Sequence, residues 1–229
     1  MAKQRVAIFD IDGTIFRSSL LIEITEALVK EGIWKSSVIA QYSAARGRWM
    51  DRKGSYDDYI QDVIEAFHKN IKGLPQTTFR KIAIRVVAEH KDRTYRYTRD
   101  LVKDLRKRNY SLLAISHSPK EAVEQFCRHL GFHKVYGQLF EVGANGRYTG
   151  KVEFQELIKD KGVILSRALE KGNFSLIGSI GVGDTESDIG FLSMVDNPIC
   201  FNPNRQLLQA ARRRAWKIVV ERKDVIYKI

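Results

Sequence analysis

The sequence of 229 residues contains only two cysteines and four prolines, and it has no internal repeat, low-complexity tract or Pro/Gly-rich linker. Cys127 and Cys200 show neither metal-site spacing nor the density of a disulfide-stapled fold, so we expect both to fill the core of a protein in a reducing compartment. No run approaches the roughly 20 apolar residues of a membrane span, and the first apolar stretch is too short for a signal peptide. These absences predict a cytoplasmic protein without a membrane segment.

The chain carries a formal net charge of +12. Residues 205–223 concentrate this charge, with seven basic residues and one acidic residue. A basic surface attracts phosphorylated metabolites, nucleic acid or anionic lipid without choosing among them. The simpler interpretation of Arg212, Arg213 and Arg214 is a solvated helix face that keeps the protein soluble.

The segment VAIFDIDGT (6–14) places two aspartates, Asp10 and Asp12, directly after a strand-like apolar run. Two carboxylates this close raise each other's pKa unless a positive charge lies between them. Mg²⁺, with its preference for oxygen ligands, supplies that charge and leaves room for a substrate phosphate. The alternative is an ordinary Asx-type turn after an edge strand.

The hydrophobic pattern changes along the chain. Residues 18–92 lack a convincing strand and show helical spacing, whereas helices and strands alternate from residue 94 onward. The expected strands are 6–9, 112–116, 135–142, 175–182, 198–201 and 216–220, and the expected helices are 95–108, 118–130, 155–171 and 205–213. This alternation predicts an α/β fold with a doubly wound parallel sheet, into which a small all-helical unit is inserted.

Polar side chains follow three of the expected strands. Asp10 and Asp12 follow the first strand, Ser116 follows residues 112–115 of the second, and Asp184 and Asp188 follow the strand at 175–182. Ligands of doubly wound sheets bind outside the carboxyl ends of the strands, so we expect these side chains to meet there. An aspartate cluster with one hydroxyl is not the mixture that turns alone would produce.

Four segments in order resemble the haloacid dehalogenase superfamily, in its phosphoserine-phosphatase-like branch. They are DIDGT (10–14), AISHSP (114–119), a lysine that opens a helix, and GVGDTESD (181–188). The resemblance covers nearly the whole chain. It implies a Rossmann-like core of residues 1–16 and 93–229 and a helical cap of residues 17–92 that closes over the site.

The resemblance also implies roles for the acidic residues. Asp10 would attack phosphorus and form an aspartyl-phosphate, which divides one hard displacement into two easier ones. Asp12 would protonate the leaving oxygen and later deprotonate water. Mg²⁺ would be held by Asp10, by the backbone carbonyl of Asp12 and by Asp184, with Asp188 as a further ligand or as support.

The remaining implied contacts are to the substrate phosphate. Ser116 and Gly13 would hold phosphate oxygens, and Lys161 would stabilise the transferring group. Lys159 and Lys151 are alternatives for this lysine. His117 is expected at the rim of the site or in packing.

The cap departs from the phosphoserine-phosphatase pattern. Ser19 stands where the resemblance leads us to expect a glutamate that binds the substrate amine, so phosphoserine is a doubtful substrate. Glu23, one helical turn further on, could replace that glutamate or be a surface residue. Ser187 stands where relatives often have asparagine. Basic and aromatic residues alternate in RGRWMDRKGSYDDY (46–59), which could bind an anionic or cyclic substrate or form an amphipathic helix.

Three functions are consistent with these observations. The first is a Mg²⁺-dependent phosphatase that acts on a small phosphorylated metabolite. The second is a phosphotransferase that passes the phosphoryl group to an acceptor other than water. The third is a non-catalytic protein that binds nucleic acid or an acidic partner through its basic surface.

Overall fold

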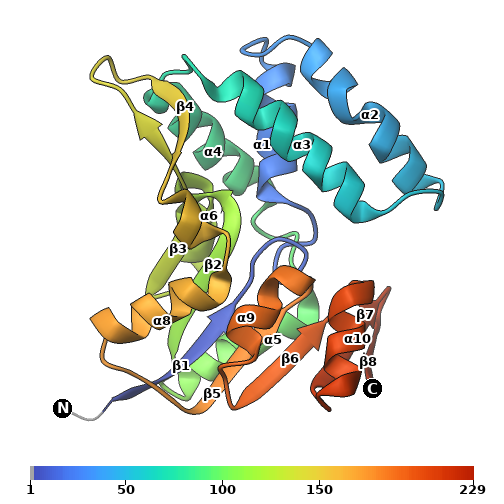
Figure 1. Cartoon of the computed structure of the whole chain (residues 1–229), viewed down its shortest axis with the longest axis vertical. Coiled ribbons are helices and arrows are strands. Elements are labelled where there is room, and N and C mark those ends of the chain that lie inside the picture. Colours follow the sequence, from blue (N-terminus) through green and yellow to red (C-terminus); the bar gives the residue numbers. More distant parts are fainter. Residues whose placement is uncertain (1–2) are drawn as a thin grey trace.

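The computed structural model describes residues 3–229 of the chain, and an eight-stranded sheet forms the centre of the described part (Figure 1). The strand order is β4-β3-β2-β1-β5-β6-β7-β8. The strands are β1 (Gln4–Phe9), β2 (Ser111–Pro119), β3 (Lys134–Val142), β4 (Tyr148–Glu153), β5 (Phe174–Gly183), β6 (Asn197–Phe201), β7 (Lys217–Arg222) and β8 (Val225–Lys228). The six central strands are parallel, and β4 and β8 pair antiparallel at the two edges. The predicted doubly wound α/β fold is therefore confirmed.

Side-chain alternation along the central strands divides the core between the two faces of the sheet. In β1, Val6 and Ile8 pack with one cluster of buried residues, whereas Ala7 and Phe9 pack with the other. Successive strand residues point to opposite faces, so a strand that is apolar throughout must be covered on both sides. One cluster includes α8 (Lys161–Lys171), α9 (Ile189–Leu192) and α10 (Arg205–Arg213), and the other includes α5 (Arg96–Lys107) and α6 (Lys120–Leu130).

Four helices fill the segment between β1 and α5. They are α1 (Leu20–Lys30), α2 (Ser37–Met50), α3 (Tyr56–Ile71) and α4 (Gln76–His90). Figure 1 shows them grouped at one end of the sheet, and aromatic contacts such as Trp34 on Phe67 hold them together. The division into a core of 1–16 and 93–229 and a cap of 17–92 stays a prediction, and residues 1–2 lie outside the described part.

The structure differs from the expected elements at five places. Two antiparallel edge strands, β4 and β8, form where the sequence indicated turns or no element. The helix expected at 155–171 is divided into α7 (Gln155–Ile158) and α8, because Asp160 caps α8 by accepting a hydrogen bond from the Gly162 N–H at 2.7 Å. The helix expected from residue 118 begins at Lys120, with Pro119 as its N-cap residue. A short 3₁₀ helix, η1 (Glu186–Asp188), links β5 to α9.

Within residues 3–229, the helices are too short or too polar to cross a lipid bilayer.

Candidate active site

The three polar strand ends predicted from the sequence lie on adjacent strands. β1 pairs with β2 on one side and with β5 on the other. The N–H of Asp10 donates to the carbonyl of Val182 at 2.9 Å, so the residue after β1 is fixed beside the end of β5. Only 4% of Asp10 is exposed. The sheet topology therefore places this carboxylate at the carboxyl edge, where doubly wound folds bind ligands.

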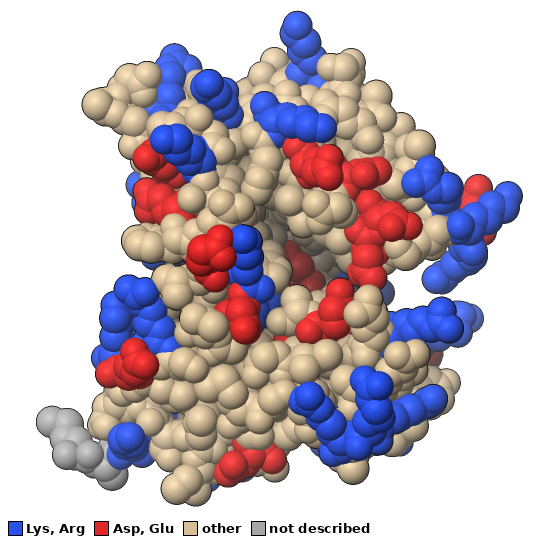
Figure 2. Space-filling model, viewed as in Figure 1, with Lys and Arg blue, Asp and Glu red and all other residues tan. Residues whose placement is uncertain are grey.

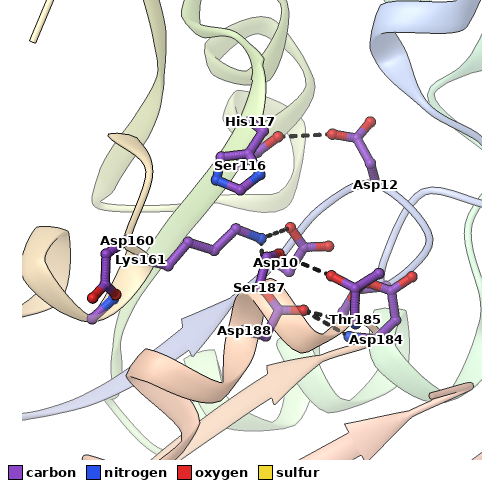
Figure 3. Close-up of polar contacts among 12 residues, drawn as sticks. Asp10, Asp12, Ser116, His117, Asp160, Lys161, Asp184, Thr185, Ser187 and Asp188 are labelled. Atoms are coloured by element: carbon purple, nitrogen blue, oxygen red, sulfur yellow. Dashed lines mark hydrogen bonds and ion pairs between the residues drawn. The ribbon is translucent and has the colours of Figure 1, made fainter. Parts of the chain in front are cut away.

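Lys161 is the cation of the site. It begins α8 and is only 2% exposed, and its Nζ lies 2.6 Å from Asp10 Oδ1 and 2.6 Å from Asp188 Oδ1 (Figure 3). Burial lowers the pKa of Lys161, but the carboxylates of Asp10 and Asp188 outweigh burial and raise it above its ordinary value. The lysine therefore stays charged. Lys159 pairs with Glu156 on the surface and Lys151 is exposed, so neither alternative reaches the site.

Asp188 is anchored on both of its oxygens. Oδ1 accepts from Lys161, and Oδ2 accepts the backbone N–H of Asp184 at 2.9 Å and of Thr185 at 3.1 Å. This arrangement shapes the loop after β5 and holds Lys161 toward Asp10 (Figure 3). The geometry suits a residue that positions its neighbours.

The residues present fit a hard divalent cation. Carboxylate oxygens of Asp10, Asp184 and Asp188 lie within 4.8 Å of one another. The second oxygen of Asp10, Oδ2, is buried and has no hydrogen-bond partner among the described residues. Clustered carboxylate oxygens with an unused lone pair are the donor set that Mg²⁺ prefers.

Burial dominates the electrostatics of the aspartates. It raises the pKa of Asp10 to about 7, with Lys161 opposing the shift and Asp188 and Asp12 adding to it. Burial and the charges of Asp10 and Asp188 likewise raise the pKa of Asp184 well above its usual range. These groups ionise readily only when more positive charge is nearby, which is the condition a bound cation meets.

Asp12 points away from this cluster, as Figure 3 shows. Its Oδ1 accepts the N–H of Leu20 at 2.6 Å, and its Oδ2 accepts the hydroxyl of Ser116 at 2.7 Å. Burial raises the pKa of Asp12 despite these hydrogen bonds. The Asp12 carboxyl is thus held apart from the carboxylates of Asp10, Asp184 and Asp188. This separation arises although only one residue lies between Asp10 and Asp12 in the sequence.

Ser116 is fully buried and is bonded on both sides. It donates to Asp12, and its Oγ accepts the N–H of Ser118 at 2.9 Å. Ser118, two residues on, lines the cavity in front of the aspartates. The structure therefore brings Ser116 to the site as the hydrogen-bond partner of Asp12, and its predicted phosphate contact stays a prediction.

Gly13 allows the loop after β1 to approach Asp184. Its φ is +79°, and a Cβ at this position would lie 2.1 Å from Asp184 Oδ2. Its N–H donates to the carbonyls of Phe16 at 2.9 Å and Ser18 at 3.2 Å, so it is already engaged. The close approach is what requires glycine here.

A cavity of about 270 Å³ lies between the strand ends and the helices α1 and α3. Its lining includes Asp10, Asp12, Lys161, Asp184, Ser19 and Ser187. Glu23, the alternative to Ser19, does not line it and instead pairs with Arg93 at 2.8 Å and with His90 at 3.3 Å. No unpaired glutamate is therefore available from α1 to bind a substrate amine in this cavity.

His117 is partly buried beside the cavity, as expected. Its Nε2–H donates to the carbonyl of Ile158 at 2.9 Å. Burial, and then the charge of Lys161, lower the pKa of His117 to about 4. The imidazole is therefore neutral at physiological pH and packs against the α7 segment.

Residues 7–193 match the model of the haloacid dehalogenase-like hydrolase family. The chain belongs to this family. It is 20% identical over 220 residues to the inhibition of morphological differentiation protein of Streptomyces azureus, covering 93% of this chain and 77% of that protein. It is 24% identical over 233 residues to the histidinol-phosphatase of Neisseria meningitidis serogroup C (strain 8013), covering 94% and 98%.

Among solved structures, a phospho-aspartyl intermediate analogue of phosphoserine phosphatase matches this hydrolase with a TM-score of 0.63 and 21% identity, covering 97% of this chain and 95% of that one. The family predicted from the sequence is confirmed, and its phosphoserine-phosphatase-like branch stays a prediction. At this identity the structural match concerns the fold.

Sequence reasoning gave no role to three residues that the hydrolase places at the site. Thr14 donates its hydroxyl to Asp184 Oδ1 at 3.2 Å, and Tyr56 and Ser118 line the cavity. The position of Thr14 within DIDGT was a usable signal. Tyr56 was noted only as one aromatic in a basic segment, because nothing in the sequence shows that α3 begins over the site.

Proposed function

We propose that this protein is a Mg²⁺-dependent phosphatase that hydrolyses a small phosphomonoester through an aspartyl-phosphate on Asp10. One observation carries the proposal: a buried lysine joins two carboxylates of a three-carboxylate cluster, and the lysine lines a cavity together with Asp10 and Asp184 of that cluster. The family and the phosphatases among its relatives support the enzyme class.

Asp10 is the nucleophile in this proposal. One of its oxygens has no hydrogen-bond partner, and Lys161 orients the carboxylate through the other. A bond forms between this carboxylate and phosphorus while the bond from phosphorus to the leaving oxygen breaks. Lys161 offsets the negative charge of the transferring group, because its ammonium is buried where electrostatic interactions are strong.

Asp12 is the general acid and base. It lines the cavity, but Ser116 and the Leu20 N–H hold it away from the carboxylate cluster. A protonated Asp12 gives its proton to the leaving oxygen in the first step. In the second step it takes a proton from the water that attacks the aspartyl-phosphate, which releases phosphate and restores both aspartates.

Asp10 and Asp184 would hold Mg²⁺, together with the backbone carbonyl of Asp12, and Asp188 would support them. When bound, the ion offsets the repulsion between the carboxylates and the incoming phosphate. Thr14 keeps Asp184 in place through its hydroxyl.

The test is turnover of an aryl phosphate such as p-nitrophenyl phosphate by the full chain with Mg²⁺. Asp10→Asn and excess chelator should each abolish turnover, and Mg²⁺ should restore it after chelation. Full activity of Asp10→Asn would sink the proposal. Added alcohols distinguish hydrolysis from transfer, because a phosphotransferase would yield alkyl phosphate in place of inorganic phosphate.

A further inference from the structure

A second, larger concavity opens beside the active-site cavity. This outer groove has a volume of about 1050 Å³. It shares Tyr56, Asp57, Asp184 and Thr185 with the lining of the inner cavity. The volume of the inner cavity, about 270 Å³, is small for a ligand-binding site. A leaving group larger than a few atoms would therefore extend into the outer groove.

Five arginines line the outer groove: Arg46 pairs with Glu26, and the other four lie on both sides of the groove. Arg17 and Arg52 come from the loop after β1 and the turn between α2 and α3, and Arg205 and Arg222 come from α10 and β7. Figure 2 shows blue, basic side chains above and below the cleft at the right-hand side of the view. All four are exposed, and none forms a salt bridge within the described part of the chain. Arg17 lies over the ring of Tyr95 at 5.5 Å, which leaves its N–H donors available.

The glutamates of the groove, by contrast, already have partners. Glu23 pairs with Arg93 and His90, Glu26 pairs with Arg46 at 3.2 Å, and Glu221 accepts the N–H groups of Arg96 at 3.1 Å and Tyr97 at 2.8 Å. Asp57 and Asp184 also line the groove where it meets the inner cavity, so the unpaired charge away from that junction is positive. A guanidinium fork binds phosphate or carboxylate oxygens in pairs, which makes arginine well suited to recognise a planar or tetrahedral anion.

The inner cavity has an acidic rim. Asp57, which also lines the outer groove, and Glu186 lie there, and the pKa of Asp57 is raised by burial and by the charge of Glu186. An anionic group on the substrate would be repelled at this rim and attracted by the arginines of the outer groove. Tyr56 stands at the junction and offers a ring against which the connecting atoms can pack.

We infer that the outer groove binds a second anionic group, a phosphate or carboxylate, at the far end of the substrate's leaving group. The inference rests on the proposed phosphatase function. It narrows the substrate class to phosphomonoesters with a distal anion, such as a bisphosphate. Ser19 in place of an amine-binding glutamate agrees with a leaving group that is recognised by negative charge.

The experiment compares α,ω-alkanediol bisphosphates with the monophosphates of the same chain length, three to six carbons long, using the full chain with Mg²⁺. We expect at least one bisphosphate to exceed its monophosphate about tenfold in kcat/KM, because charge-assisted hydrogen bonds of this kind are worth a factor of that order. Arg52→Gln and Arg222→Gln should each reduce this ratio about three- to tenfold. Arg213→Gln, an exposed arginine of α10 outside the groove, is the matched control and should leave the ratio unchanged.

A second substrate series distinguishes a distal phosphate from a distal carboxylate. Phosphate esters of ω-hydroxy acids carry a carboxylate in place of the distal phosphate, and a preference for them over the bisphosphates identifies the carboxylate as the distal group. The inference is overturned if the monophosphates, the bisphosphates and the carboxylate series are all hydrolysed at equal rates and the arginine variants have no effect. Turnover of aryl phosphate in the same experiment would still support the proposed phosphatase function.

Binding provides a readout that does not depend on turnover. Calorimetric titration of wild type with the bisphosphate should give a Kd at least about threefold lower than that of Arg52→Gln or Arg222→Gln. If aryl phosphate is not hydrolysed, the proposed function fails and this titration still decides the inference: an equal Kd for all three proteins overturns it.

Discussion

Replacement of Lys161 by methionine tests the electrostatics of the site through protein stability. The lysine is 2% exposed and lies 2.6 Å from a carboxylate oxygen of each of Asp10 and Asp188. Removing one partner of a buried ion pair costs about 3–5 kcal/mol, because the remaining charge is left uncompensated. With a urea m-value of about 2–3 kcal/mol/M, the unfolding midpoint in chelator should fall by about 1–2 M.

The assay is urea unfolding followed by tryptophan fluorescence, with and without Mg²⁺. Lys159→Met is the matched control, since Lys159 pairs with Glu156 on the surface and such pairs are worth at most about 1 kcal/mol. Mg²⁺ should stabilise Lys161→Met more than wild type, because the ion then carries the missing positive charge. The reasoning is refuted if Lys161→Met and Lys159→Met unfold at the same urea concentration in chelator.

Two further variants test the geometry and the pH dependence. Gly13→Ala puts a Cβ 2.1 Å from the Asp184 carboxylate, so aryl phosphate turnover should fall about 100-fold. The control is Gly146→Ala, where φ is a similar +72° and no atom lies within 4 Å of the new Cβ. This variant should keep full turnover and lose about 1–2 kcal/mol of stability. Unchanged turnover of Gly13→Ala would contradict the close approach. The pKa of His117 is lowered from 6.5 to about 4, so the unfolded chain binds more protons between these values and wild-type stability should fall as pH drops through this window, by up to about 3 kcal/mol. His117→Gln should remove that part of the slope in unfolding curves measured from pH 4 to 7, and an unaltered slope would mean that His117 is not buried in its neutral form.

The sequence predicted the position of the site because the rules that govern it are local. A strand that is apolar throughout lies inside a parallel sheet, and the polar residue that follows it appears at the carboxyl edge. Asp10 and Asp184 could therefore be placed together from the strand ends, whereas Lys161 was expected only from the resemblance to the family. Family membership was available from the order of the four motifs.

Contacts between side chains from distant segments could not be predicted in this way. The bond between Asp12 and Ser116 depends on the direction of two rotamers, and the outer groove depends on how Arg17 and Arg222 approach across the finished fold. The edge strand β4 was also missed, because its residues begin inside a turn-rich segment and become a strand only by pairing with β3. Antiparallel edges of this kind follow from tertiary pairing and leave a weak local signal.

The central claim is that Asp10 carries the phosphoryl group during turnover. The most direct measurement is to quench the enzyme during turnover of aryl phosphate with Mg²⁺, reduce it with borohydride, and examine the tryptic peptide of residues 6–17 by mass spectrometry. Reduction of an aspartyl-phosphate converts the aspartate to homoserine. Homoserine should appear at position 10 alone, should depend on substrate and Mg²⁺, and should be absent from Asp10→Asn. Turnover with an unmodified Asp10, or homoserine at position 12, would contradict it.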